Sequence, residues 1–137
     1  MFCLCIVALD MRTDIFALCE GAFNRNGSLT IVNTFDNIEA SRLPWRTTVG
    51  LALKYSVTSE DAGEKKMIIR FLDNTGKEIL PSIPVNLKII DKQEESHLVI
   101  AVNLQNIVFT KSGQYIVSVI IDGVVFNTLS FNVISHE

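Results

Sequence analysis

Hydrophobic and polar residues alternate along most of this chain, which is the pattern of β-strands with one buried face. The clearest example runs from Arg46 to Val57. Its odd-numbered positions from 49 onward are all apolar, whereas positions 50, 52, 54 and 56 are small or polar. The same alternation returns, with many β-branched residues, at residues 66–72, 98–104, 115–121 and 125–133. No segment of ten residues shows helical spacing, so we expect a chain of strands.

Turn-forming dipeptides separate these segments at the intervals typical of a sandwich or barrel. Asn26-Gly27 and Asp122-Gly123 each suit a two-residue turn in which both residues have positive φ. Asp122-Gly123 lies between two apolar segments, so we predict a hairpin over residues 116–131. That many strands on one chain must bury a sheet face against another sheet. The sequence therefore predicts an all-β fold, a two-sheet antiparallel β-sandwich of about seven to nine strands.

The segment that begins Gly113-x-Tyr115 makes this prediction more specific. A tyrosine entering an alternating strand in this way resembles the tyrosine corner of immunoglobulin-like folds, where the phenol bonds to the backbone a few residues upstream. The Cys-Trp-Cys set of antibody domains is absent from the sequence. We therefore predict an immunoglobulin-like sandwich with a single domain over residues 12–135. Residues 1–11 are then an N-terminal extension or an extra strand.

The first ten residues contain a short apolar run, from Phe2 to Leu9. Such a run is shorter than the roughly 20 residues that cross a bilayer, so no membrane span is expected. No basic residue precedes Arg12 and no small-residue cleavage site follows the run, so secretion is not expected either. Two interpretations stay open. The protein starts at Met1, or it starts at Met11 and residues 1–10 are an upstream extension.

The three cysteines also bear on the compartment. Cys3, Cys5 and Cys19 are an odd number and lie close together, which is not a disulfide framework. Cys3-x-Cys5 has no second pair and no histidine before His97, so a zinc site is not expected. Reduced thiols are typical of the cytoplasm. We therefore expect a cytoplasmic protein without a metal ion.

Composition and charge exclude several function classes. The chain has 137 residues, of which 48% are hydrophobic and 20% charged, so it can fill a core and is not expected to be disordered. Its net charge of −3 lacks the basic excess of nucleic-acid-binding proteins. No nucleophile elbow, phosphate-binding loop, dinucleotide fingerprint or zinc-binding histidine pair occurs. His97 follows the charged run 91–95, which is typical of a solvated hairpin loop. We therefore expect no enzyme, no cofactor and no nucleic-acid partner.

The segment Arg42-Leu43-Pro44-Trp45-Arg46 is the strongest candidate for binding. It holds the one tryptophan of the chain, between two arginines, at the entry to the clearest strand. Tryptophan and arginine dominate binding hot spots, and a ring beside cations can receive a sugar, an acidic peptide or a partner protein. The alternative, which we favour, is that Trp45 closes the open end of the sandwich while Arg42 and Arg46 stay in water.

The predicted outer faces carry more apolar residues than a monomer usually exposes. If the odd-numbered positions from 115 to 121 and from 125 onward point into the core, several apolar even-numbered residues point outward. Strands that are apolar on both faces usually have something covering each face. The cover can be the N-terminal segment, a loop or a second copy. We predict self-association through this hairpin, with the contact residues Ile116, Ile120, Val124 and Phe126.

Several short motifs follow one another along the chain, namely residues 17–22, 27–32, 34–36, 43–44, 70–73 with Gly76, 80–81, Gly113-x-Tyr115 and Asp122-Gly123. Together they resemble a bacterial family of short all-β proteins that is catalogued as a domain of unknown function. The resemblance covers about residues 12–135. It implies an immunoglobulin-like sandwich, a bacterial origin and a start near Met11, and it carries over no catalytic residue.

Three classes of function follow, in this order of preference. The first is a non-catalytic interaction or binding module that acts through loops or a sheet surface. The second is a structural subunit of a homo-oligomer or of a larger assembly, and an enzyme is a distant third. The expected partner is a protein or a second copy of the chain. The sequence identifies no small-molecule ligand.

Overall fold

The protein consists of β-strands joined by short connections. The computed structural model describes residues 11–90 and 96–137, in which the only helix is the single 3-10 turn η1 (Ser59–Asp61). These residues form nine strands, namely β1 (Arg12–Arg25), β2 (Ser28–Thr34), β3 (Asn37–Ala40), β4 (Trp45–Val57), β5 (Gly63–Asp73), β6 (Ile83–Ile89), β7 (Ser96–Phe109), β8 (Gly113–Ile121) and β9 (Val124–Ser135). The predicted all-β fold and strand number are confirmed. Residues 1–10 of the predicted extension and the charged run 91–95 lie outside the described residues.

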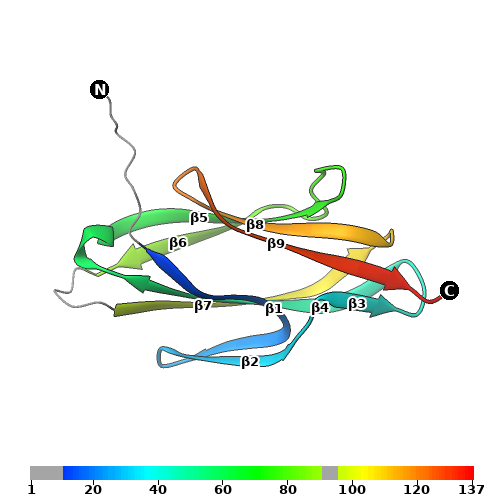
Figure 1. Cartoon of the computed structure of the whole chain (residues 1–137), viewed down its shortest axis with the longest axis horizontal. Coiled ribbons are helices and arrows are strands. Elements are labelled where there is room, and N and C mark those ends of the chain that lie inside the picture. The colour runs from blue at the N-terminus through cyan, green and yellow to red at the C-terminus, as the bar shows by residue number, and fades with distance from the viewer. Residues whose placement is uncertain (1–10, 91–95) are drawn as a thin grey trace.

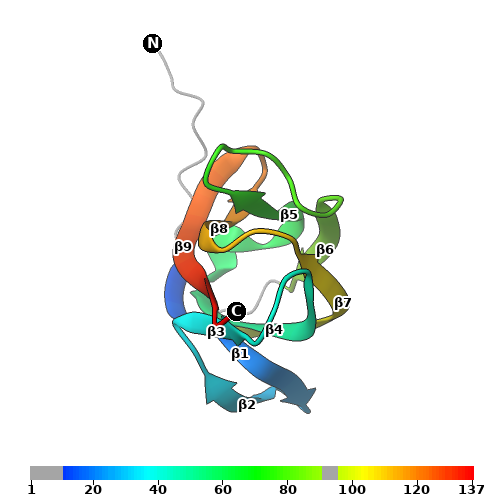
Figure 2. The same ribbon diagram turned by 90° about the vertical axis from the view of Figure 1, so that its right-hand side faces the viewer.

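The strands form two sheets, which lie one above the other in Figure 1. The strand order is β2-β1-β4-β7 in the four-stranded sheet and β3-β9-β8-β5-β6 in the five-stranded sheet. In the end view of Figure 2, β2 lies at the bottom, on the side away from the five-stranded sheet. The four-stranded sheet is therefore curled rather than flat.

One strand pair departs from the predicted antiparallel arrangement. β3 pairs with β9 in parallel, with Ile38 opposite Val133. The other strand pairs of the described residues are antiparallel. β3 is reached from β2 and leads to β4, both of which belong to the other sheet. Its direction is set by this crossing between sheets and not by a hairpin turn, so the antiparallel prediction is wrong for this pair.

Both sheets contribute side chains to one hydrophobic core. The predicted inward positions of β4, from Val49 to Val57, are all buried, as are the inward positions of β5 and β8. Burial of one such side chain stabilises the fold by about 1.5–3 kcal/mol. At one end of the core four aromatic rings contact one another, with centroids 5.1 to 6.4 Å apart, namely Phe71, Phe109, Tyr115 and Phe131.

The β1–β2 hairpin covers part of the outer face of β4. β1 pairs with β4 as far as Cys19 and Gly50, and beyond Cys19 it pairs with β2. A second, smaller apolar cluster forms there from Cys19, Ala22 and Ala52. Both faces of this part of β4 are therefore buried, which explains why positions 50 and 52 carry small residues.

Asn103 of β7 fixes this hairpin to the sheet. Its Oδ1 accepts a hydrogen bond from the Ala22 backbone N at 3.0 Å, and its Nδ2 donates to the Ala22 carbonyl at 2.7 Å. The side-chain amide thus takes the place of a strand partner for one residue. This link joins positions 81 residues apart in the chain.

The two predicted turn dipeptides have the expected conformation. Asn26, Gly27, Asp122 and Gly123 have φ between 49° and 87°, as a two-residue hairpin turn with two positive φ values requires. The predicted hairpin over residues 116–131 is confirmed as β8 and β9.

The tyrosine corner is present as well, because the Tyr115 hydroxyl donates to the Lys111 carbonyl at 2.6 Å. Burial raises the pKa of the Tyr115 phenol.

A polar link connects the two sheets. The Tyr55 hydroxyl on β4 donates to Asn127 Oδ1 on β9 at 2.6 Å, and Asn127 Nδ2 donates to Thr13 Oγ1 on β1 at 2.9 Å. Tyr55 is fully buried, and this burial raises the pKa of its phenol. Asn127 is the one polar residue among the odd-numbered positions of β9 from 125 to 133, which are otherwise apolar, and it is the residue that forms this link.

Candidate functional site

The outer face of the five-stranded sheet carries a row of apolar residues. Pro84, Ile68, Ile120 and Val125 are direct cross-strand neighbours on β6, β5, β8 and β9. The residues that flank Ile68 and Ile120 along their strands are fully buried, so these two side chains face away from the core. Val125 is 61% exposed and Ile68 is 37% exposed. We call these four residues the apolar row.

A β-bulge determines which residues of β9 face outward. The register of β8 and β9 shifts after the pair Ile120–Val125, which leaves Phe126 as an additional residue. Phe126 packs against the core, and its ring meets that of Tyr55 edge-on with centroids 5.5 Å apart. The predicted outward position of Phe126 and the predicted inward position of Val125 are therefore wrong. The inserted residue reverses the alternation on one side of it.

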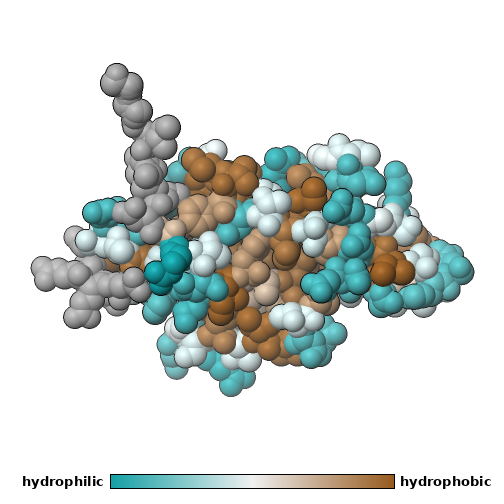
Figure 3. All heavy atoms as spheres, viewed as in Figure 1, coloured by the Kyte–Doolittle hydropathy of each residue, from teal (hydrophilic) through white to brown (hydrophobic). Residues whose placement is uncertain are grey.

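The other residues predicted for self-association lie on or near the apolar row. Ile120 belongs to the row, and Ile116 lies on the same face of β8, half-buried. Val124 pairs with the fully buried Ile121 and so lies on the opposite face of the sheet from Ile120, but next to the β8–β9 turn it is 52% exposed. Figure 3 shows apolar side chains gathered at this turn, at the upper left. Self-association through these residues stays a prediction.

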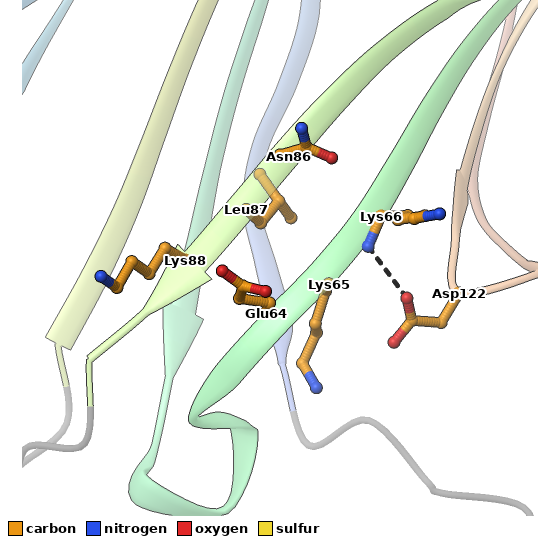
Figure 4. A pocket seen from close by; sticks show the side chains of 7 residues that line it. All are labelled: Glu64, Lys65, Lys66, Asn86, Leu87, Lys88 and Asp122. Carbon is orange, nitrogen blue, oxygen red and sulfur yellow. Dashed lines mark hydrogen bonds between the residues drawn. The ribbon is translucent and has the colours of Figure 1, made fainter.

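A hollow of about 460 Å³ lies next to the apolar row, where β5 begins and β6 ends. Figure 4 shows that Lys65, Lys66 and Lys88 border it together with Glu64 and Asp122. Asp122 is fixed in place, because its Oδ1 accepts from the Lys66 backbone N and its own N donates to the Lys66 carbonyl, both at 2.9 Å. Three lysines and two carboxylates give the lining residues a net formal charge of +1. We call this feature the lysine hollow.

Trp45 lies against the core, whereas its two neighbouring arginines lie in solvent. The indole is half-buried and packs on the core cluster, while Arg42 and Arg46 are exposed. Trp45 also lines a cavity of about 280 Å³, and neither arginine is among the residues that line it. The ring thus covers the core on one side and borders a cavity on the other. The role of these three residues in binding stays a prediction.

Asp14, Ser56 and His97 meet on the outer face of the four-stranded sheet, an arrangement that the sequence did not predict. Ser56 Oγ donates to Asp14 Oδ2 at 2.6 Å. His97 Nδ1 lies 3.4 Å from Ser56 Oγ and 3.6 Å from Asp14 Oδ2. The hydrogen bond from Ser56 holds the pKa of the Asp14 carboxyl below its ordinary value. The strand register brings Ser56 opposite His97, and register cannot be read from residue spacing.

The geometry of this cluster differs from that of a hydrolytic triad. In such a triad the imidazole lies between the serine and the carboxylate and takes the serine proton. Here the Ser56 hydroxyl donates its hydrogen bond directly to the Asp14 carboxylate, and Arg12 Nη2 donates to the same Ser56 Oγ at 3.0 Å. The Ser56 side chain is also almost completely buried. The arrangement fits a structural link among β1, β4 and β7.

Two histidine–carboxylate pairs are the nearest approach to a metal site. His97 lies beside Asp14, and His136 Nε2 lies 2.7 Å from Glu39 Oε1. A structural zinc ion usually has about four protein ligands, and each pair supplies two. Residues 11–90 and 96–137 contain no group of three or more histidine, cysteine, aspartate or glutamate side chains that could hold a metal ion.

In the same residues, no helix has the length and apolar character that crossing a bilayer requires.

A family model matches nearly the whole chain. It is described as a family of unknown function (DUF6941), and it matches residues 14–134. The chain belongs to the DUF6941 family. This membership confirms the resemblance to a family of unknown function that the short motifs indicated. No match to the chain is found among curated proteins.

Three solved structures resemble the chain at low sequence identity. An immunoglobulin-like protein from Pseudomonas aeruginosa has a TM-score of 0.47 and 15% identity, over 91% of this chain and 97% of that chain. The alkylpurine DNA glycosylase AlkC from Pseudomonas fluorescens, bound to DNA with an abasic site analog, has a TM-score of 0.48 and 10% identity, over 93% and 31%. A β-glucosidase from Listeria innocua in complex with glucose has a TM-score of 0.47 and 12% identity, over 92% and 16%. The chain spans less than a third of these two enzymes, and we draw no function from them.

Proposed function

We propose that this protein is an immunoglobulin-like β-sandwich that acts as a non-catalytic interaction module and binds an acidic protein partner. The binding surface is the outer face of the five-stranded sheet. The observation that carries the proposal is the apolar row, which crosses four neighbouring strands and faces away from the core. The shared core between the two sheets supports the sandwich assignment.

The apolar row has the composition expected at the centre of a protein interface. A partner that covers it removes apolar surface from water, which contributes about 25 cal/mol per Å². The next cross-strand row on the same face is polar and consists of Arg70, Ser118 and Thr128. An apolar centre with a polar rim is the usual anatomy of such interfaces.

Charge favours an acidic partner. The chain as a whole carries a net charge of −3, yet lysines outnumber carboxylates around the lysine hollow. Charges of opposite sign on a partner accelerate association and fix its orientation. We therefore place acidic side chains of the partner at the hollow and its apolar side chains on the row.

A second copy of the chain is the alternative occupant, and Ile116 and Ile120 favour it because they lie on the same outer face, while Val124 is exposed at its edge beside the β8–β9 turn. Pairing two identical faces would supply no acidic group in excess of the lysines to complement either hollow. We therefore prefer a different, acidic protein.

We infer a bacterial origin and a cytoplasmic location for the module. Cys19, the one cysteine in the described part of the chain, is a free and buried thiol. A free thiol is typical of a reducing compartment. The bacterial origin rests on the resemblance of the short motifs.

Site-specific photocrosslinking tests the proposal. Ile120 is replaced by benzoylphenylalanine, and in a matched control Val108, an exposed residue of β7, is replaced instead. After irradiation in the producing cells, we expect a covalent adduct with another protein from position 120 and none from position 108. The adduct partner is then purified, and its binding to the intact chain is measured by calorimetry at low and high salt.

Three variants decide whether the captured protein binds the proposed face. Ile120→Ser and Lys66→Glu are expected to weaken binding at least about tenfold, because the first removes a central apolar contact and the second reverses a charge at the lysine hollow. Val108→Ser is expected to bind like the unchanged chain. An adduct with a second copy alone would replace the proposal with the homo-oligomer. Equal adducts from positions 108 and 120, or unchanged affinity of the Ile120 and Lys66 variants, would overturn it.

A further inference from the structure

A second candidate site lies at the opposite end of the molecule from the lysine hollow. Elements β1, β3 and the start of β4 border a cavity of about 280 Å³ together with the connection between β2 and β3. Figure 1 places β3 and the C-terminus at this end, and Figure 2 views the molecule from it. The volume is just below the roughly 300–1,000 Å³ of sites for drug-sized ligands, so it suits one side chain or a small molecule. We call it the Trp45 cavity.

Two aromatic side chains line this cavity. Phe35 and Trp45 are each half-buried, and each packs against the hydrophobic core as well as bordering the cavity. Packing on the core holds the rings in place before any ligand arrives. The face of an aromatic ring attracts a cation within about 6 Å, and tryptophan does so most strongly.

Two carboxylates line the same cavity, and neighbouring side chains position both. Glu20 Oε1 accepts a hydrogen bond from Asn33 Nδ2 at 2.9 Å, and Glu39 Oε1 lies 2.7 Å from His136 Nε2. No lysine or arginine of the described residues is among those that line the cavity. The lining is therefore negatively charged, in contrast to the lysine hollow.

This lining bears on the chemistry of the ligand. The sequence placed Trp45 between Arg42 and Arg46 and allowed a sugar, an acidic peptide or a partner protein as ligand, but both arginines lie outside the cavity lining. An acidic group placed in the cavity would meet Glu20 and Glu39 and be repelled. A planar guanidinium combines the two contacts that the lining offers, because it stacks on aromatic rings and pairs with carboxylates.

We propose that the Trp45 cavity binds a guanidinium group on a short alkyl chain. The group is carried by an arginine side chain of a peptide or by a free alkylguanidine. The site is separate from the proposed interaction face, lies at the other end of the fold and selects the opposite charge. Its test is therefore independent of the partner that binds the apolar row.

Tryptophan fluorescence tests this proposal directly, because Trp45 is the one tryptophan of the chain. The full chain is titrated with acetyl-Gly-Arg-Gly-amide and with the matched peptide that contains neutral citrulline instead of arginine. Butylguanidinium and butylurea form the corresponding pair of small molecules. We expect a saturable change in emission with the guanidinium probes and none with the neutral ones.

The two sources of the ligand are distinguished by comparing the charged probes. Tighter binding of the arginine peptide than of butylguanidinium indicates a peptide ligand, and the reverse order indicates a free alkylguanidine. Either order supports the cavity as a guanidinium site.

Variants that keep Trp45 as the reporter locate the binding. Glu20→Gln with Glu39→Gln is expected to weaken binding of the charged probes at least about tenfold, because charge-assisted bonds are lost. Phe35→Leu is expected to weaken it about two- to fivefold. Glu64→Gln, a change of the same kind at the lysine hollow, serves as the control and is expected to leave binding unchanged.

Three results would overturn the proposal. The first is equal binding of the arginine and citrulline peptides. The second is unchanged affinity of the double glutamine variant while it keeps the thermal stability of the parent. The third is the absence of a saturable response to any guanidinium probe, both in fluorescence and in amide chemical shifts of the unmodified chain. The comparison of charged and neutral peptides needs no variant, so the test does not depend on whether a variant folds.

Discussion

At the scale of single residues, Gly50 of β4 has no room for a side chain. A Cβ atom at this position would lie 3.0 Å from Cys19 Sγ, 3.1 Å from Asn103 Oδ1 and 3.1 Å from the Gly21 Cα. The last of these contacts is with backbone, which cannot rotate away. Glycine at position 50 therefore lets the β1–β2 hairpin lie directly on β4.

We predict that Gly50→Ala lowers the free energy of unfolding by about 1–3 kcal/mol, because the added methyl group forces the hairpin away from β4. The measurement is chemical denaturation. Gly21→Ala is the matched control, since its Cβ would meet mainly the ring of the exposed Phe23 at 3.3 Å, and that ring can move. Equal losses in the two variants would contradict the packing argument.

At the scale of secondary-structure elements, the β1–β2 hairpin is attached to the sheet by polar contacts as well as by apolar ones. The Asn103 amide makes both hydrogen bonds to the backbone of Ala22. Ala22 itself is almost completely buried. Without the amide, its backbone N–H and carbonyl would stay buried and unsatisfied, which costs about 1–3 kcal/mol.

We predict that Asn103→Ala loosens this hairpin more than the rest of the protein. Amide hydrogen exchange of residues 21–32 is expected to become faster, while exchange in β5 and β8 stays close to that of the parent. Gln105→Ala, an exposed change on the same strand, is the control and is expected to leave both regions unchanged. Uniform acceleration across both sheets would show that the contact stabilises the whole fold and not the hairpin alone.

At the scale of the whole molecule, the two sheets are joined by apolar packing and by the polar link through Asn127. Tyr55 and Thr13 belong to the four-stranded sheet, and Asn127 belongs to the five-stranded one. Because Asn127 binds both partners, each hydrogen bond helps to place its amide for the other. The link therefore acts as a unit.

We predict that Tyr55→Phe costs about 1–3 kcal/mol of unfolding free energy, since it leaves Asn127 Oδ1 without its donor. Thr13→Val removes the second bond of the link. The double variant is expected to lose less than the sum of the two single losses, by at least about 0.5 kcal/mol. Strictly additive losses would show that the two hydrogen bonds act separately.

The features that could be predicted from the sequence are those that depend on residues close together along the chain. Alternation identified the buried face of β4, and the Asn26-Gly27 and Asp122-Gly123 dipeptides identified two hairpin turns. The side on which Phe126 lies depends on a bulge, which alternation cannot reveal. The cavity beside Trp45 likewise depends on which strands meet at one end of the fold. The limits of the domain, the binding roles and the self-association stay predictions.

The parallel pair of β3 and β9 has a consequence for how the chain folds during its synthesis. Residues 37–40 leave the ribosome long before residues 132–135, with which they pair. All four strands of the other sheet, by contrast, have been made once residue 109 is added. Since nascent chains begin to fold from the N-terminal side, that sheet can assemble first, and β3 must wait for the last strand to emerge before its edge is completed.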